Sequence, residues 1–103
     1  MDAKAHLRKA ISLNPDYSEA YYELGLLLKK DGESGQALEH FQKAVSLRND
    51  FAEAECELAI MLQFTKDLES SRNHFLNSLE INPNYANAYF HYGLLLIELE
   101  DIE

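Results

Sequence analysis

The chain has 103 residues, 47% of them hydrophobic and 26% charged, and its formal net charge is −9 at pH 7. These values are typical of one folded, soluble, cytoplasmic domain with a continuous core, and no apolar run is long enough to span a bilayer or to serve as a signal peptide. The acidic balance disfavours nucleic acid and anionic membrane surfaces as partners, because their phosphates would be repelled.

Apolar residues recur every three or four residues in six segments, which is the pattern of amphipathic helices and not the alternation of strands. Asn14-Pro15 and Asn82-Pro83 end two of these segments, because the residue before a proline avoids the helical region. Asp31-Gly32 places a glycine just past the end of another. We therefore predict helices at about 2–14, 18–31, 34–48, 52–65, 68–82 and 86–101, joined by short turns that make neighbouring helices antiparallel.

Similar residues return every 34 positions along the chain. Large apolar residues and small residues each keep their own phase, as in Leu7/Phe41/Phe75, Ala10/Ala44/Ser78 and Gly25/Ala59/Gly93. We expect the small residues of the last set to let paired helices approach closely, so that its glycines serve packing. A fixed period of this length is typical of stacked-repeat proteins, in which each helical unit buries its apolar face only against its neighbours.

The spacing of aromatic, small and aliphatic residues is that of a known repeat. Tyr21-x-x-Leu24-Gly25-x-x-Leu28, followed by Ala37-x-x-x-Phe41-x-x-Ala44, resembles the tetratricopeptide repeat. In the next copy Glu55 stands where a large aromatic residue is usual. The resemblance implies an all-α solenoid of about six helices stacked as antiparallel pairs. It divides a single array over 1–103 into the second helix of one repeat (2–14), two full repeats (18–51 and 52–85) and the first helix of a further repeat (86–101), which favours a fragment of a longer array.

Three histidines, His6, His40 and His74, share one phase of the repeat and invite a metal-site interpretation. Packed helices lie about 10 Å apart, whereas zinc needs each ligand nitrogen at about 2 Å, so we expect no bound metal. Cys56 is the single cysteine and cannot form an internal disulfide, which fits a reducing compartment.

The sequence carries no arrangement of catalytic residues that we can identify. A glycine-rich phosphate loop, GxSxG, HExxH and CxxC are all absent. Stacked helices also seldom enclose a pocket with convergent polar groups. We therefore expect neither an enzyme nor a bound cofactor.

The resemblance implies a ligand site on a concave inner face, formed by the first helix of each repeat. On this face an apolar ladder is flanked by acidic residues, which favours protein or peptide ligands with Lys or Arg beside aliphatic or aromatic anchors. Chaperone-binding members of the family hold a peptide carboxylate with basic residues in this groove, and the corresponding groove positions of this chain lack them. The expected groove residues are Glu19, Tyr22, Glu23, Leu26, Glu53, Cys56, Glu57, Ile60, Asn87, Phe90, His91 and Leu94.

The last predicted helix is apolar nearly all round, which indicates that something covers it. If the cover is not the rest of a longer array, copies of the chain would associate through Tyr89, Tyr92, Leu95, Leu96 and Leu99. Two forms are open: a head-to-tail oligomer in which 86–101 packs on 2–14 of the next copy, and a closed dimer that exchanges these helices, which we expect for a soluble sample. A structural self-assembly element is therefore the alternative to a peptide-binding module.

Overall fold

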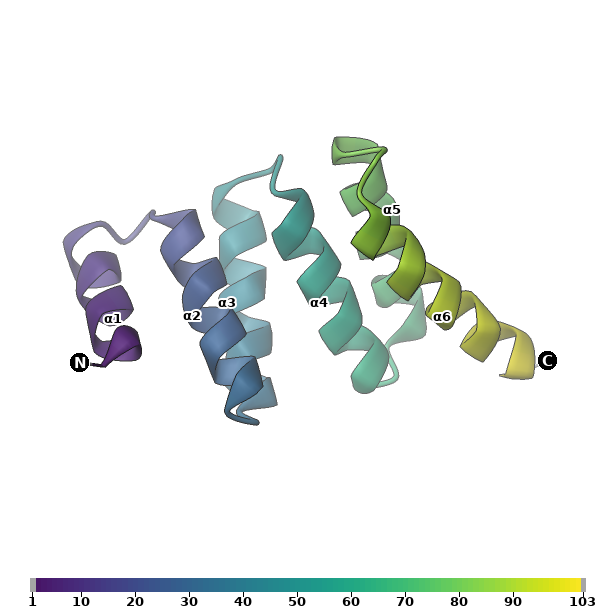
Figure 1. Ribbon diagram of the computed structural model, residues 1–103, viewed down its shortest axis with the longest axis horizontal. Helices are drawn as coiled ribbons and strands as arrows, with labels where there is room; N and C mark the ends of the chain where they lie inside the picture. Colours follow the sequence, from purple (N-terminus) through teal and green to yellow (C-terminus); the bar gives the residue numbers. More distant parts are fainter. Residues whose placement is uncertain (1, 103) are drawn as a thin grey trace. The chain divides into compact units, whose positions relative to one another are not determined.

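The computed structural model describes residues 2–102, and side chains as far as residue 101. The described residues form six helices and no strand, which confirms the predicted all-α fold (Figure 1). The helices begin and end within two residues of the predicted positions. They are α1 (Ala3–Leu13), α2 (Ser18–Lys30), α3 (Ser34–Leu47), α4 (Ala52–Phe64), α5 (Leu68–Ile81) and α6 (Ala86–Ile102).

The helix ends follow from local chemistry. The Asp2 carboxylate caps α1 by accepting a hydrogen bond of 3.0 Å from the Lys4 amide. Asn14 and Asn82, each followed by proline, are the C-caps of α1 and α5. Gly32 follows α2 with a φ of 82°, in the left-handed region that glycine adopts freely.

Lys66 occupies the position of Gly32 one repeat later, and it also has a positive φ, of 67°. A side chain at Cβ makes this conformation unfavourable by about 1–2 kcal/mol. The turn after α4 therefore keeps the backbone of the turn after α2 without the residue that suits it best.

The chain divides into two compact units, residues 1–50 and residues 51–103. In the first unit, the core between α2 and α3 is formed by Leu24, Leu28, Ala37, Phe41 and Ala44, each at most 1% exposed. Gly25 lets these helices approach closely, since a Cβ built there would lie 2.7 Å from Phe41 Cε1. The glycine was predicted to serve packing, and the structure confirms that role.

In the second unit, α5 packs against both α4 and α6, and α4 also contacts α6. The buried cluster that joins the three helices consists of Cys56, Ala59, Ile60, Phe75, Ala88 and Leu95. The Phe75 and Tyr92 rings stack with centroids 5.8 Å apart. Hydroxyls of the buried Ser71 and Ser78 donate to the carbonyls of Ala59 and Ala52 at 2.7 and 2.8 Å, so α5 is bonded to α4 as well as packed on it.

Candidate protein-interaction surfaces

The first unit has a hollow of about 180 Å³ between α1 and α2. Its lining is mainly apolar and includes two exposed carboxylates. It is lined by Leu7, Ala10, Tyr17, Glu19, Ala20 and Glu23. Two of the predicted groove residues, Glu19 and Glu23, thus belong to a surface depression that combines negative charge with apolar area.

The Glu19 carboxylate is held in its ionised form. The Ser18 hydroxyl donates to Glu19 Oε1 at 2.6 Å and lowers the pKa of the carboxyl, and the Arg48 guanidinium, 4.0 Å from Glu19 Oε2, acts in the same direction. The two other predicted groove residues of α2, Tyr22 and Leu26, are half-buried. Tyr22 leans on the core, with its ring centroid 6.0 Å from that of Phe41.

In the second unit, a polar cluster lies where α4 meets the start of α6. Burial raises the pKa of the Tyr85 phenol, and the nearby carboxylates of Glu53 and Glu57 act in the same direction, while a hydrogen bond with Asn87 opposes them. The Asn87 amide nitrogen also lies 4.0 Å from the Cys56 sulfur. Glu53 and Asn87 are exposed and Glu57 is half-exposed, so three predicted groove residues surround this phenol.

Two predicted groove residues do not reach the surface. Cys56 is fully buried and Ile60 is 6% exposed, and both belong to the core of the second unit. Their place in the groove was therefore wrong. The physical reason is that α6 packs over them and brings Ala88 and Leu95 into the same cluster.

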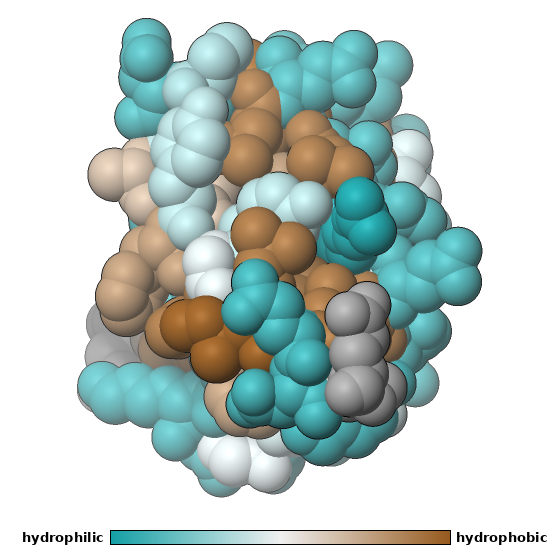
Figure 2. All heavy atoms as spheres, turned by 90° about the vertical axis from the view of Figure 1, so that its right-hand side faces the viewer, coloured by the Kyte–Doolittle hydropathy of each residue, from teal (hydrophilic) through white to brown (hydrophobic). Residues whose placement is uncertain are grey.

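The outer side of α6 is an apolar stripe in the second unit. Phe90, Leu94 and Ile97 are 63%, 43% and 58% exposed, and Tyr89 and Leu96 beside them are 55% and 40% exposed. Apolar atoms gather on this side of the molecule and are bordered by hydrophilic residues (Figure 2). His91 is half-buried, with its ring 5.1 Å from that of Phe90.

The structure corrects one predicted self-association residue and adds another. Leu95 is fully buried against α4 and α5, so it cannot contact a second molecule, and Tyr92 and Leu99 are partly buried around the same core. Ile97 was not among the predicted groove or self-association residues. Its spacing from Phe90 and Leu94, seven and three residues, is the helical signal that could have identified it.

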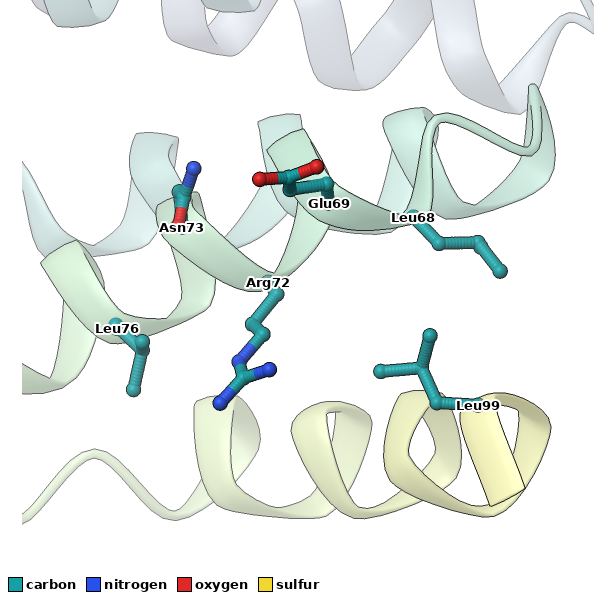
Figure 3. A pocket seen from close by; sticks show the side chains of 6 residues that line it. All are labelled: Leu68, Glu69, Arg72, Asn73, Leu76 and Leu99. Atoms are coloured by element: carbon teal, nitrogen blue, oxygen red, sulfur yellow. The ribbon is translucent and has the colours of Figure 1, made fainter. Parts of the chain in front are cut away.

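A second hollow, of about 440 Å³, lies between α5 and α6. Leu68, Arg72 and Leu76 point from α5 towards α6, and Leu99 points back from α6 (Figure 3). Glu69 and Asn73 complete its lining but point away from α6. This hollow was not predicted from the sequence, because five of its six lining residues belong to α5, the second helix of a repeat.

The three histidines of the shared phase have different partners. His6 Nδ1 lies 3.0 Å from the Asp2 carbonyl oxygen, and His40 Nδ1 lies 2.8 Å from that of Gln36, each one turn back in its own helix. His74 Nδ1 instead lies 2.6 Å from the carboxylate of Glu55, which is 9% exposed. In the described part of the chain, no three His, Cys, Asp or Glu side chains form a group that could hold a metal ion.

The fold consists of antiparallel helix pairs, with small residues between the helices at a period of 34 residues. Residues 6–39 and 74–103 match the tetratricopeptide repeat family. The chain belongs to this family. Tetratricopeptide repeats serve in general as protein–protein interaction modules. Within the described residues, no helix is both long and apolar enough to cross a membrane. No curated protein sequence matches the chain.

Solved structures with the same fold include three proteins. A crystal structure of MamA has a TM-score of 0.86 and 23% identity, over 95% of this chain and 57% of that one. A mutant of the Thermobaculum terrenum O-GlcNAc transferase has a TM-score of 0.84 and 26% identity, over 91% of this chain and 18% of that one. YrrB has a TM-score of 0.78 and 21% identity, over 88% of this chain and 47% of that one. The chain thus spans about half the length of MamA and YrrB and a much smaller part of the transferase.

Proposed function

We propose that the chain binds a peptide or partner helix that presents Lys or Arg beside apolar anchors, on the faces of α2, α4 and α6. The observation that carries this proposal is that exposed carboxylates on α2 and α4 stand beside accessible apolar surface, in the hollow next to α2 and on α6. YrrB is described as a tetratricopeptide-repeat protein with an unusual peptide-binding site, and its similar fold makes peptide binding by this chain a natural hypothesis.

In the first unit, the proposed contacts are the lining residues of the hollow beside α2. An aliphatic or aromatic side chain of the ligand would enter the hollow, whose lining includes Leu7 and Ala20. A Lys or Arg of the ligand would pair with Glu19 or Glu23, whose exposure lets the carboxylates stay hydrated until the ligand arrives.

In the second unit, the proposed contacts are Glu53 and Glu57 around Tyr85, together with Asn87, Phe90 and Leu94. Seven of the nine basic residues lie in residues 1–50, whereas ten of the eighteen acidic residues lie in residues 51–103, which leaves net charges of −1 and −8. The field of the second unit therefore attracts a cationic ligand more strongly than that of the first.

The test is the binding of a labelled peptide of alternating Lys and Leu, followed by fluorescence anisotropy, with a Glu and Leu peptide as its negative control. The double variant Glu23→Lys/Glu53→Lys reverses one exposed charge in each unit. We expect it to bind the basic peptide about tenfold more weakly at low salt, with a smaller salt dependence, because attraction is replaced by repulsion.

The matched control is Glu39→Lys/Glu80→Lys, which changes the net charge by the same amount on exposed positions of α3 and α5. Its affinity should stay within about twofold of the parent, since only the overall field changes. Equal losses in the two double variants would show that net charge alone attracts the peptide, and unchanged affinity in both would reject the proposed faces.

A further inference from the structure

The uncovered side of α6 has a counterpart inside the first unit. Tyr89, Gly93 and Leu96 stand two periods after Tyr21, Gly25 and Leu28 of α2, with identical residue types. The first residue of each set is also held in the same way. The Tyr89 hydroxyl donates to the Pro83 carbonyl at 3.0 Å, and the Tyr21 hydroxyl donates to the Pro15 carbonyl at 3.1 Å.

In α2 these three positions pack against α3. The Phe41 ring of α3 fills the space above Gly25, with Cε1 only 2.7 Å from an ideal Cβ, and the His40 ring lies 5.9 Å from that of Tyr21. Leu28 is fully buried in the same contact.

In α6 the same positions are open. No heavy atom lies within 4 Å of a Cβ built at Gly93, and Tyr89 and Leu96 are 55% and 40% exposed. This face of α6 therefore suits a helix that resembles α3. Such a helix has a large apolar residue and a small residue about one turn before and one turn after it.

A helix with this pattern is α1. Ala3, His6, Leu7 and Ala10 stand one period before Ala37, His40, Phe41 and Ala44 of α3. Ala37, Phe41 and Ala44 are fully buried in α3, whereas α1 has no buried residue and Ala3 is exposed. The other helix of this phase, α5, carries serines at the alanine positions and already packs on α4 through them.

The charges of α1 and α6 are complementary. α1 carries Lys4, Arg8 and Lys9, and α6 carries Glu98, Glu100 and Asp101 in its last turns. In the register of α2 and α3, an antiparallel contact sets only the first turn of α1, with Lys4, beside the acidic end of α6, and Arg8 and Lys9 lie farther from it. Lys4 and Glu98 already pair with Asp31 and Lys66 of their own molecules, so the opposite net charges of the two helices act through their fields and steer the association.

We propose that α6 of one molecule binds α1 of a second molecule, and that this head-to-tail contact reproduces the α2–α3 pair with Leu7 seated at Gly93 and His6 beside Tyr89. The same contact covers the hollow between α1 and α2 of the second molecule, to which Leu7 and Ala10 contribute. The contact is heterologous, so it leaves one free face at each end and the assembly can grow. A closed exchange of α6 between two copies fits less well, because α6 lacks the small and large residues of the α1 pattern.

The experiment is sedimentation equilibrium of the 103-residue chain over a range of concentrations, with variants that block one face each. Gly93→Gln fills the seat on α6, and Ala3→Glu places a charge at the counterpart of the buried Ala37. Both positions are open in the structure, so circular dichroism should show folded proteins. The wild-type mass should rise with concentration, and each variant should associate at least about tenfold more weakly.

Two controls make the same changes elsewhere. Gly35→Gln alters a helical glycine of α3 with open space around it, and Ala5→Glu alters an exposed alanine on another side of α1. Both should associate within about twofold of wild type, since neither position lies on the proposed contact. An Ala5→Glu effect as large as that of Ala3→Glu would overturn the proposal.

Mixing the two blocked variants decides the direction of the contact. Gly93→Gln still offers an intact α1 and Ala3→Glu still offers an intact α6, so the mixture should form a one-to-one dimer that grows no further, although each variant alone is monomeric. Raising the salt should weaken this dimer. A wild-type chain that stays monomeric at about millimolar concentration, or a mixture that contains only monomers, would reject the proposal; binding of the basic peptide to the monomer would be unaffected by either result.

Discussion

Lys66 shows how one residue can depart from the repeat while the backbone does not. The repeat position is filled by Gly32 after α2, and Lys66 adopts a similar positive φ after α4. Its side chain compensates in part, because the ammonium donates to Glu98 Oε2 at 2.9 Å and lowers the pKa of that carboxyl, to which Gln63 also donates. Lysine at this position thus costs backbone strain and gains an exposed ion pair, and the contribution of that ion pair to stability is small.

We predict that Lys66→Gly is more stable than Lys66→Ala by about 1 kcal/mol, because both variants lose the ion pair but only glycine relieves the left-handed backbone. Urea unfolding followed by circular dichroism measures the difference. Equal stabilities would contradict a strained backbone at this position.

Tyr85 links burial to the pH dependence of stability. Its phenol pKa is raised above the usual value of 10.0, mainly by burial, so the folded state holds this proton more tightly than the unfolded state. The resulting stabilisation is complete below pH 10 and is lost as the pH rises through the higher pKa of the folded state.

We therefore predict that the wild-type chain loses stability more steeply than Tyr85→Phe as the pH rises above about 10, because the variant has no phenol to ionise at this position. Thermal unfolding at several pH values makes the comparison, with Tyr17→Phe as a control at an exposed tyrosine. Parallel losses in wild type and Tyr85→Phe would mean that this phenol is not perturbed.

At the scale of the helix, two glycines with the same repeat phase have opposite surroundings. Gly25 supports the Phe41 ring, while Gly93 faces open space. The sequence alone suggested close packing at both positions, since the residue type and phase are identical. What differs is whether a neighbouring helix is present.

We predict opposite signs for alanine at these two positions. Gly25→Ala should destabilise the chain by about 1–3 kcal/mol, because the buried Phe41 ring has no room to retreat. Gly93→Ala should stabilise α6 by about 0.5–1 kcal/mol, because alanine favours the helix. Unfolding is best measured at low protein concentration, where association does not contribute, and a stabilising Gly25→Ala would contradict the close approach of α2 and α3.

The elements themselves were predictable, and the faces of the apolar helices were not. Periodicity, Asn-Pro stops and Gly32 define the helices because they act within a few residues. α4 and α6 are apolar on most sides, so their sequences do not show which side packs inward. For this reason Cys56, Ile60 and Leu95 were assigned to surfaces although they lie in the core, and the exposed Ile97 was missed.

At the scale of the whole chain, the second unit carries most of the net negative charge, and hydroxyl and carboxylate hydrogen bonds supplement the apolar packing of its core. Ser71 and Ser78 stand where the first unit has alanines, and Glu55 with His74 stands where it has Tyr21 and His40. Because repeat proteins are stabilised unit by unit, a defect in this core should act first on its own helices.

Phe75→Ala tests this expectation. The ring is fully buried, stacks on Tyr92 and belongs to the cluster that joins α4, α5 and α6, so its loss should destabilise the second unit by about 3–5 kcal/mol. Leu76→Ala is the control. Leu76 follows Phe75 in the sequence but is 44% exposed, so its loss should change stability far less. Native-state hydrogen exchange should then show faster exchange in α4–α6 than in α2 and α3. A loss under about 1 kcal/mol, or uniform acceleration in both units, would contradict a separate core centred on Phe75.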